Sequence, residues 1–195
     1  MQHKVKLTVI DKKLYPELQA QYCADPHSGA CPCYNVGDTF IFERYGTADD
    51  FWHMGLNTLK QTDNGVDRIA GGAAFPHCSE AWDAISRYIY TGLQGGSIMR
   101  GWMNDERVMI ACCSDGTRPV IFKIERMDYK AVYIDKVMDA ECQNKLKDAF
   151  MQIAAVTDVV FRDGYAEIYL QSDVTDEALT NAAASCGEYS IVKID

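Results

Sequence analysis

The chain of 195 residues contains eight cysteines, and their placement is its clearest chemical signal. Six fall in the first two-thirds of the sequence: Cys23, Cys31, Cys33, Cys78, Cys112 and Cys113, with His27 and His77 close by. No apolar signal-peptide core precedes them, and thiols in proteins without a secretory signal are more often metal ligands or redox groups than structural disulfides. The cysteines therefore indicate soft-metal or thiol chemistry.

Four cysteines on separate segments are the candidate ligands of one converging metal site: Cys23, Cys31, Cys78 and Cys112. Thiolate and imidazole groups are the ligands that Zn, Fe and Cu take in such sites. Either Cys33 or His27 could replace one member of the set. The chain has no Cys-x-x-Cys pair, so an ordinary zinc ribbon is not indicated. The alternative interpretation is that these cysteines are small apolar residues of a core.

The adjacent residues Cys112 and Cys113 fall in a predicted strand, where successive side chains point to opposite faces. At most one of them is expected to reach a given site. A second hypothesis needs no metal: Cys78 or Cys31 would act as a reactive thiol, as nucleophile or electron-pair carrier. A third is a non-catalytic interaction module. No glycine-rich nucleotide motif, P-loop or Ser-His-Asp grouping is present, and the pattern leaves open whether the protein is an enzyme.

Composition restricts the partners. The net charge of -9 argues against nucleic acid, which is bound mainly through Lys and Arg, and against an anionic membrane surface. Residues 128–195 hold most of this charge, with 6 Lys and Arg against 13 Asp and Glu. No apolar run reaches the length of a membrane span. We expect a cytoplasmic protein with reduced thiols, a state that an anaerobic host would favour.

In the first part of the chain, periodicity and turn residues predict a mixture of short strands and helices. The expected strands are 4–10, 39–43, 107–112 and 119–124, the expected helices are 49–60 and a helix from an N-cap at Ser79 to residue 93, and the expected irregular segments are 22–36 and 62–75. The last two strands form a hairpin whose turn contains Asp115 and Gly116.

The last third of the chain predicts the order βαββαβ. The expected elements are a strand at 131–137, a helix at 140–154, a hairpin of 156–162 and 165–171 across Asp163-Gly164, a helix capped by Asp173 or Thr175 and ending at 184, and a strand at 189–194. This order is that of the ferredoxin-like split βαβ arrangement.

The same region resembles the heavy-metal-associated domains of copper chaperones and metal-pumping ATPases, which open their first helix with Met-x-Cys-x-x-Cys. The matching positions are Cys142, Leu146, Ala149 and Phe150, then Val156–Val159, then Asp176–Cys186. Asp139 stands at the position of the family's first cysteine. A linear Cu(I) site needs two soft ligands, so the resemblance implies the fold and not copper transfer. Cys142 and Cys186 are interpreted as core residues.

The first part of the chain resembles an uncharacterised family of small cysteine-containing proteins of anaerobic bacteria and archaea. The matching segments are Lys4–Ile10 with Tyr22-Cys23, Cys31-Pro32, Val36–Phe40, Cys78–Trp82 and Ala111–Phe122, with an apparent insertion at 46–74. This resemblance implies a shared fold and no named activity.

Together these patterns predict an α+β protein of two domains. Residues 1–127 would form a mixed α+β domain with a small antiparallel sheet, and residues 128–195 the ferredoxin-like, heavy-metal-associated-like domain. The segment between the two domains is short, which predicts that the domains pack against each other. An exposed edge strand of the second domain would allow homodimerisation.

Overall fold

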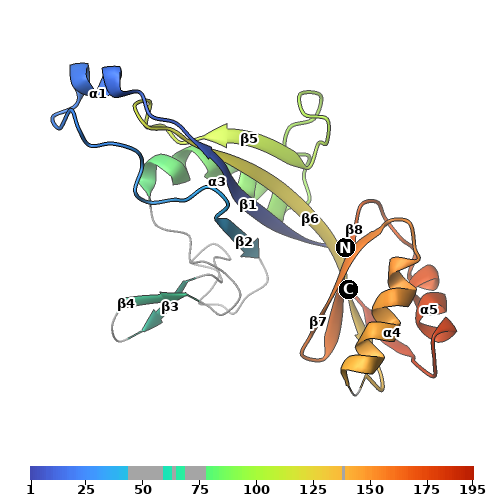
Figure 1. The fold of residues 1–195 in the computed structure, drawn as a ribbon. Helices are drawn as coiled ribbons and strands as arrows, with labels where there is room; N and C mark the ends of the chain where they lie inside the picture. Colours follow the sequence, from blue (N-terminus) through green and yellow to red (C-terminus); the bar gives the residue numbers. More distant parts are fainter. Residues whose placement is uncertain (44–58, 63–64, 69–77, 138) are drawn as a thin grey trace. The chain divides into compact units, whose positions relative to one another are not determined.

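Figure 1 shows the computed structural model of the chain, which describes residues 1–43, 59–62, 65–68, 78–137 and 139–195. The strands are β1 (Gln2–Lys12), β2 (Thr39–Glu43), β3 (Leu59–Thr62), β4 (Gly65–Arg68), β5 (Val108–Cys112), β6 (Val120–Ile134), β7 (Val156–Arg162), β8 (Tyr165–Leu170) and β9 (Ile191–Ile194). The helices are α1 (Pro16–Tyr22), α3 (Ser79–Leu93), α4 (Ala140–Met151) and α5 (Asp176–Ser185). Helices combined with a seven-stranded antiparallel sheet confirm the predicted α+β class. Within the described ranges, no helix is long and apolar enough to cross a membrane.

Contacts divide the chain into two compact units. The N-terminal unit is His3–Arg126, and the C-terminal unit is Met127–Asp195 together with Met1 and Gln2. The boundary falls inside β6, which is one strand where the sequence predicted two, at 119–124 and 131–137. The strand continues because it pairs with β5 as far as Glu125 and with β8 from Asp128 onward. That the units are separate domains stays a prediction.

In the N-terminal unit, one face of the sheet packs against α3. β1 pairs with β2 and β5 pairs with β6, both antiparallel. Apolar residues of α3 recur at helical spacing, so the helix buries Ala81, Ile85 and Ile89 on one side. They join Phe42 and Phe122 in a core where each of these aromatic side chains is fully buried. This core supports the cysteine-bearing segments described below.

The structure differs from the sequence predictions at four places in this unit. The helix α1 was not predicted, because its seven residues are too few for a periodic signal and only its leading Pro16 marks a helix start. The N-cap of α3 is Cys78 and not Ser79, with extended backbone (φ -129°, ψ 114°) and no side-chain cap. Residues 65–68, predicted as irregular, form β4, because the backbone pairs antiparallel with β3. The helix predicted at 49–60 lies outside the described residues except for its last two, which belong to β3.

The C-terminal unit follows the element order β6-α4-β7-β8-α5-β9. Strand β8 lies between β6 and β7, and β9 pairs with the other side of β6, all antiparallel. Both helices cover the same face of this sheet and lie side by side (Figure 1). Leu146 and Phe150 of α4 and Leu179 of α5 are fully buried against the sheet. The predicted cap at Thr175 is confirmed, since its hydroxyl accepts from the Ala178 N–H at 3.2 Å.

The opposite face of this sheet carries tyrosines around a buried acid. Glu167 is only 2% exposed, and its carboxylate accepts hydrogen bonds from the Tyr169 hydroxyl at 2.7 Å and from Arg162 at 3.0 Å. The ring of Tyr165 packs on that of Tyr133 with centroids 5.4 Å apart. Because burying an unpaired charge is costly, these donors are what makes an acid tolerable here.

Candidate thiol site

The segment that carries Cys31 and Cys33 is fixed by hydrogen bonds at both ends. Before the cysteines, the buried side chain of Gln19 donates to the Gly29 carbonyl at 3.0 Å and accepts from the Gly29 N–H at 3.1 Å. Gly29 has φ +72°, a conformation that favours glycine. After them, the Asp38 carboxylate accepts from the Asn35 N–H at 2.8 Å. The two thiols are therefore presented on a defined loop.

The start of α3 and the end of β5 are attached to each other. The Ser114 N–H donates to the Glu80 carbonyl at 3.1 Å, and the Ser114 hydroxyl also donates to the Glu80 carboxylate. This attachment places Cys78, the N-cap of α3, near the turn that follows β5. Cys113 is buried in that turn, where its sulfur accepts from the Val120 N–H at 3.3 Å.

The Cys33 thiol interacts with two other thiols from these segments, Cys31 and Cys78, and we call the three the thiol cluster. Partial loss of solvent around the sulfur raises the pKa of the Cys33 thiol, and the neighbouring thiols of Cys31 and Cys78 and a side-chain hydrogen bond with Cys31 raise it further. Cys33 is exposed, whereas Cys31 and Cys78 are half-buried and pack on the core of the N-terminal unit. All three are free thiols.

The buried phenol of Tyr34 lies near the thiol cluster. Burial raises the pKa of Tyr34, and the thiols of Cys78, Cys33, Cys31 and Cys113 raise it further. The ring makes edge-to-face contacts with Phe40 and Phe122, at centroid distances of 6.3 and 5.3 Å. Four sulfurs are thus within electrostatic range of one phenol, although the segments that carry them lie up to about 80 residues apart in the sequence.

Arg118 interacts with the thiol cluster, and Lys12 bonds the loop that carries Cys31 and Cys33. The Arg118 guanidinium is held by Asp115, whose carboxylate accepts from Nε at 2.9 Å. This bond raises the pKa of Arg118, and the negative charges of Cys31 and Cys33 add to the effect. Burial acts to raise the pKa of Asp115, but hydrogen bonds from Arg118 and the neighbouring turn outweigh it and lower that pKa. The Lys12 ammonium donates to the Tyr34 carbonyl at 2.5 Å.

The structure brings together two of the four predicted metal ligands, Cys31 and Cys78. Cys23 follows α1 as its C-cap, half-buried, and Cys112 is exposed at the end of β5. Among the described residues, no group of three or more His, Cys, Asp and Glu side chains is arranged to hold a metal ion, so the four-cysteine site stays a prediction. His27 is exposed in the loop.

Sequence reasoning underrated two cysteines. Cys33 was named only as a substitute ligand, yet it is the thiol on which Cys31 and Cys78 both act. Cys112 and Cys113 do differ in environment as expected, but the buried Cys113 and not Cys112 interacts with Tyr34. The Cys-Pro-Cys spacing was a usable signal for Cys33. Nothing in the sequence distinguishes the two faces of the β5 end, because its two residues are both cysteine.

The position expected for copper in the C-terminal unit does not fit a two-thiolate site. Asp139 is the N-cap of α4, and its carboxylate accepts from the Cys142 N–H at 2.9 Å. The Cys142 thiol also donates to the Asp139 carboxylate, and both bonds from Cys142 lower the pKa of Asp139. A hydrogen bond with the same thiol raises the pKa of Tyr189. Cys186 donates to the Ala183 carbonyl at 3.3 Å, and burial raises its pKa. Asp139 thus acts as a helix cap, and no second thiol takes its place.

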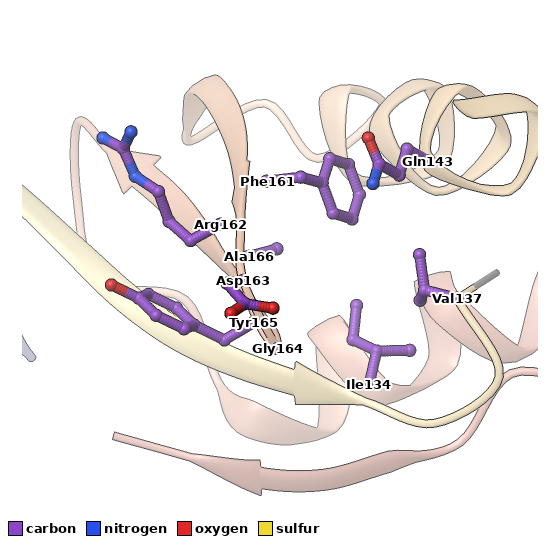
Figure 2. Close-up of a pocket in the computed structure, with 9 residues that line it drawn as sticks. All are labelled: Ile134, Val137, Gln143, Phe161, Arg162, Asp163, Gly164, Tyr165 and Ala166. Atoms are coloured by element: carbon purple, nitrogen blue, oxygen red, sulfur yellow. The ribbon is translucent and has the colours of Figure 1, made fainter. Parts of the chain in front are cut away.

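A cavity of about 200 Å³ opens in the C-terminal unit beside the β7–β8 turn. Figure 2 shows Ile134, Val137, Phe161 and Gln143 around its centre, whereas Arg162 points away from them. No cysteine is among the residues that line it, so this cavity is separate from the thiol chemistry of the chain.

No protein-family model, no curated protein and no solved structure significantly matches the chain. The two family resemblances drawn from the sequence therefore stay predictions, and the function is argued from the thiol cluster.

Proposed function

We propose that this protein works by reversible dithiol–disulfide chemistry at Cys31 and Cys33, with Cys78 as a third participating thiol. The observation that carries the proposal is that Cys31 and Cys33 stand two residues apart on a loop that Gln19 holds at Gly29 and Asp38 holds at Asn35. Cys31 and Cys78 both raise the pKa of Cys33. Two thiols that are two residues apart on one loop need little movement of the rest of the chain to form a disulfide. The exposure of Cys33 gives an incoming molecule access to the pair.

The reaction requires a disulfide as the oxidant. The Cys33 thiolate attacks one sulfur of RSSR, a mixed disulfide forms, and the first RSH leaves with a proton. Cys31 or Cys78 then attacks the Cys33 sulfur, and the second RSH leaves. In sum, two protein thiols and RSSR give one protein disulfide and two RSH. The reverse reaction reduces a disulfide partner.

A test counts thiols before and after oxidation. The fully reduced protein is treated with 2-hydroxyethyl disulfide in the absence of oxygen, and the remaining thiols are alkylated and counted by intact mass. We expect two of the eight thiols to be lost and to return with dithiothreitol. Cys33→Ser should prevent the loss, whereas Cys112→Ser, which removes an exposed thiol of the same unit, should not. Undiminished loss in a Cys31→Ser/Cys33→Ser variant would contradict the proposal.

Metal binding is the second candidate function, and the convergence of three thiols from two distant segments favours it. Thiolates select soft metals such as Cu(I) and Zn, which would require the three side chains to draw closer. Cys31, Cys33 and Cys78 would be the ligands, since Cys113 already bonds the Val120 N–H. Elemental analysis of protein purified without oxygen or chelator tests this candidate: about one metal per chain supports it, and its absence leaves the dithiol function.

For the C-terminal unit we propose the ferredoxin-like arrangement. The strand order β9-β6-β8-β7 and the two helices on one face support it. With Asp139 acting as a helix cap, we propose a supporting role for this unit and no copper transfer. A copper titration of Cys31→Ser/Cys33→Ser/Cys78→Ser tests this: stoichiometric Cu(I) bound through Cys142 would contradict it.

A further inference from the structure

We propose that two copies of the chain associate by pairing their β5 strands edge to edge and antiparallel, as one continuous sheet. Strand β5 pairs with β6 on one side (Figure 1), and within the described ranges no strand pairs with its other side. A free strand edge presents backbone N–H and carbonyl groups that another strand can bond. The dimer does not depend on the dithiol function, so either proposal can fail alone.

The hydrogen bonds with β6 show which backbone groups of β5 face outward. In an antiparallel pair, alternate residues bond the partner strand, and the residues between them face away from it. Just before β5, the Arg107 carbonyl accepts from the Arg126 N–H at 2.8 Å. Just after it, the Cys113 N–H donates to the Val120 carbonyl at 3.1 Å. The odd-numbered residues therefore bond β6, and the backbone groups that face outward belong to Val108, Ile110 and Cys112.

Strand β5 lacks the features that keep sheet edges from pairing with other strands. Its sequence, Val-Met-Ile-Ala-Cys, contains no charged residue, proline or glycine. The other described strands with an edge, β2, β3, β4, β7 and β9, each carry at least one charged residue, and β7 is also irregular near Asp158. Charges and bulges at an edge oppose pairing with a further strand. Among the described edges, β5 is therefore the least protected against pairing.

The length of the free edge matches that of β5 itself. At one end, the outward carbonyl of Glu106 is already bonded by the Ile98 N–H at 2.7 Å. At the other end, the Ser114 N–H donates to the Glu80 carbonyl at 3.1 Å, so the chain turns toward α3. A longer partner strand meets the backbone at Ile98, whereas β5 of a second copy turns away at its own Ser114. The free edge therefore favours a second copy over an unrelated strand.

The side chains of β5 are complementary to themselves when Ile110 lies opposite Ile110 of the second copy. Val108 then lies opposite Cys112 of the second copy, so each cross-strand pair on this face is apolar. Ile110 is 38% exposed and Cys112 is exposed, and pairing covers both. The charges beside them on β6, Lys123 and Glu125, bond each other at 2.9 Å. No like charges are brought together by these pairs.

The same register uses the outward backbone groups of both copies. Each Ile110 N–H donates to the Ile110 carbonyl of the other copy, and each Cys112 N–H donates to the Val108 carbonyl of the other copy. The Val108 N–H needs no partner, because it already donates to the Asp105 carbonyl at 3.0 Å. Both copies contribute the same residues, so the interface is closed by a two-fold axis and stops at a dimer.

Sedimentation velocity of the full-length protein, with a phosphine reductant to exclude disulfide-linked species, tests the association from about 1 μM to about 1 mM. We expect the mass to rise from 21.8 kDa toward twice that value. Over the same range, iodoacetamide should label Cys112 more slowly, because the second copy covers it. A mass of 21.8 kDa at every concentration would overturn the proposal.

Two variants at Ile110 should give a monomer. Ile110→Pro removes the outward N–H and leaves the bonds to β6, a position that proline tolerates in an edge strand. Ile110→Lys keeps the backbone and places two like charges opposite each other. Ile10→Lys is the matched control, since Ile10 is 40% exposed on β1, which lies between β2 and β6. Val192→Lys makes a similar change on β9, an edge of the C-terminal unit, and both controls should still dimerise.

The variants decide which surface is used. If Ile110→Lys and Ile10→Lys weaken association equally, exposed apolar surface and not strand pairing causes it, and the proposal is wrong. Loss of the dimer in Val192→Lys alone would move the interface to β9, the unit for which the sequence predicted dimerisation, and would also contradict it. A circular dichroism spectrum confirms that each variant is folded, and if Ile110→Pro is not, Ile110→Lys decides.

Discussion

Gln19 and Gly29 exchange two hydrogen bonds, with the Gln19 amide donating to the Gly29 carbonyl at 3.0 Å and accepting from the Gly29 N–H at 3.1 Å. One side chain thereby satisfies both backbone groups of a residue at the entrance of the cysteine loop. Gln19 is only 2% exposed, so water does not compete for these bonds. The pair connects the short helix α1 to the positions of Cys31 and Cys33.

Removing this pair should loosen the cysteine loop. In Gln19→Leu the partly buried Gly29 N–H and carbonyl lose two hydrogen bonds, which should lower the free energy of unfolding by about 1–3 kcal/mol. Gln21→Leu makes the same change at an exposed position of α1 and should shift it by less than about 0.5 kcal/mol. Urea denaturation measures both. Equal midpoints for the two variants would show that Gln19 does not hold the loop.

The pH dependence of Cys33 alkylation should change when the neighbouring thiols are removed. Thiolates are the reactive form, and the raised pKa of Cys33 means that a smaller fraction is thiolate at a given pH below it. Burial, the first cause, persists in Cys31→Ser/Cys78→Ser, but the two negative charges do not. The pKa should fall, and the alkylation profile should move to lower pH.

Arg118→Gln should move the same profile to higher pH, because Arg118 lowers the pKa of Cys33. Iodoacetamide labelling of Cys33, followed by peptide mass spectrometry from roughly pH 7 to pH 10, measures both shifts. Identical profiles in the double serine variant and the unmodified protein would mean that the three thiols do not interact.

Asp105 should stabilise the N-terminal unit in a pH-dependent way. The hydrogen bond from Arg107 lowers the pKa of Asp105 from 3.8 to about 2, against the opposing effect of burial. Because the folded pKa lies below the unfolded one, the stabilisation is complete above about pH 4 and is lost as the pH falls toward 2. The pair is partly exposed, so Asp105→Asn should cost roughly 1 kcal/mol or less at pH 7.

This difference between Asp105→Asn and the unmodified protein should vanish by about pH 2. Thermal unfolding across this range gives the dependence. A double-mutant cycle with Arg107→Gln isolates the pair, and a coupling free energy that does not change with pH would contradict the assignment.

Tyr169 should matter more to the C-terminal unit than its neighbour Tyr133. Its hydroxyl donates to the buried Glu167 carboxylate at 2.7 Å, so Tyr169→Phe should lower the free energy of unfolding by about 1–3 kcal/mol. Tyr133→Phe on the same face keeps its ring contact with Tyr165 and should cost less. Chemical denaturation compares them, and an equal cost would indicate that Glu167 does not depend on Tyr169.

Local signals in the sequence predicted most of the C-terminal elements. Asp163-Gly164 predicted the β7–β8 turn, and Gly164 does adopt φ +83° there. Thr175 predicted the start of α5 because a hydroxyl at that position can accept from the first turn. Such signals work because each depends on a few adjacent residues.

Features that depend on distant residues were not predictable in this way. The break expected between 124 and 131 does not occur, because β5 and β8 extend β6 from its two ends. The partnership of Cys33 with Cys78 depends on how the loop and α3 pack on the core, which spacing alone does not give. The spacing of the cysteines in the sequence showed which of them could act together. The packing of the loop and α3 on the core decides which of them do.

Disulfide mapping tests the central claim most directly. Trypsin releases Cys31 and Cys33 together with Cys23 in residues 14–44, and releases Cys78 separately in residues 69–87. After oxidation with 2-hydroxyethyl disulfide and alkylation, we expect either a disulfide joining Cys31 to Cys33 or a cross-link of these two peptides through Cys78, as fragmentation spectra distinguish. Fully alkylated Cys31, Cys33 and Cys78, or a disulfide between other cysteines, would contradict the dithiol account.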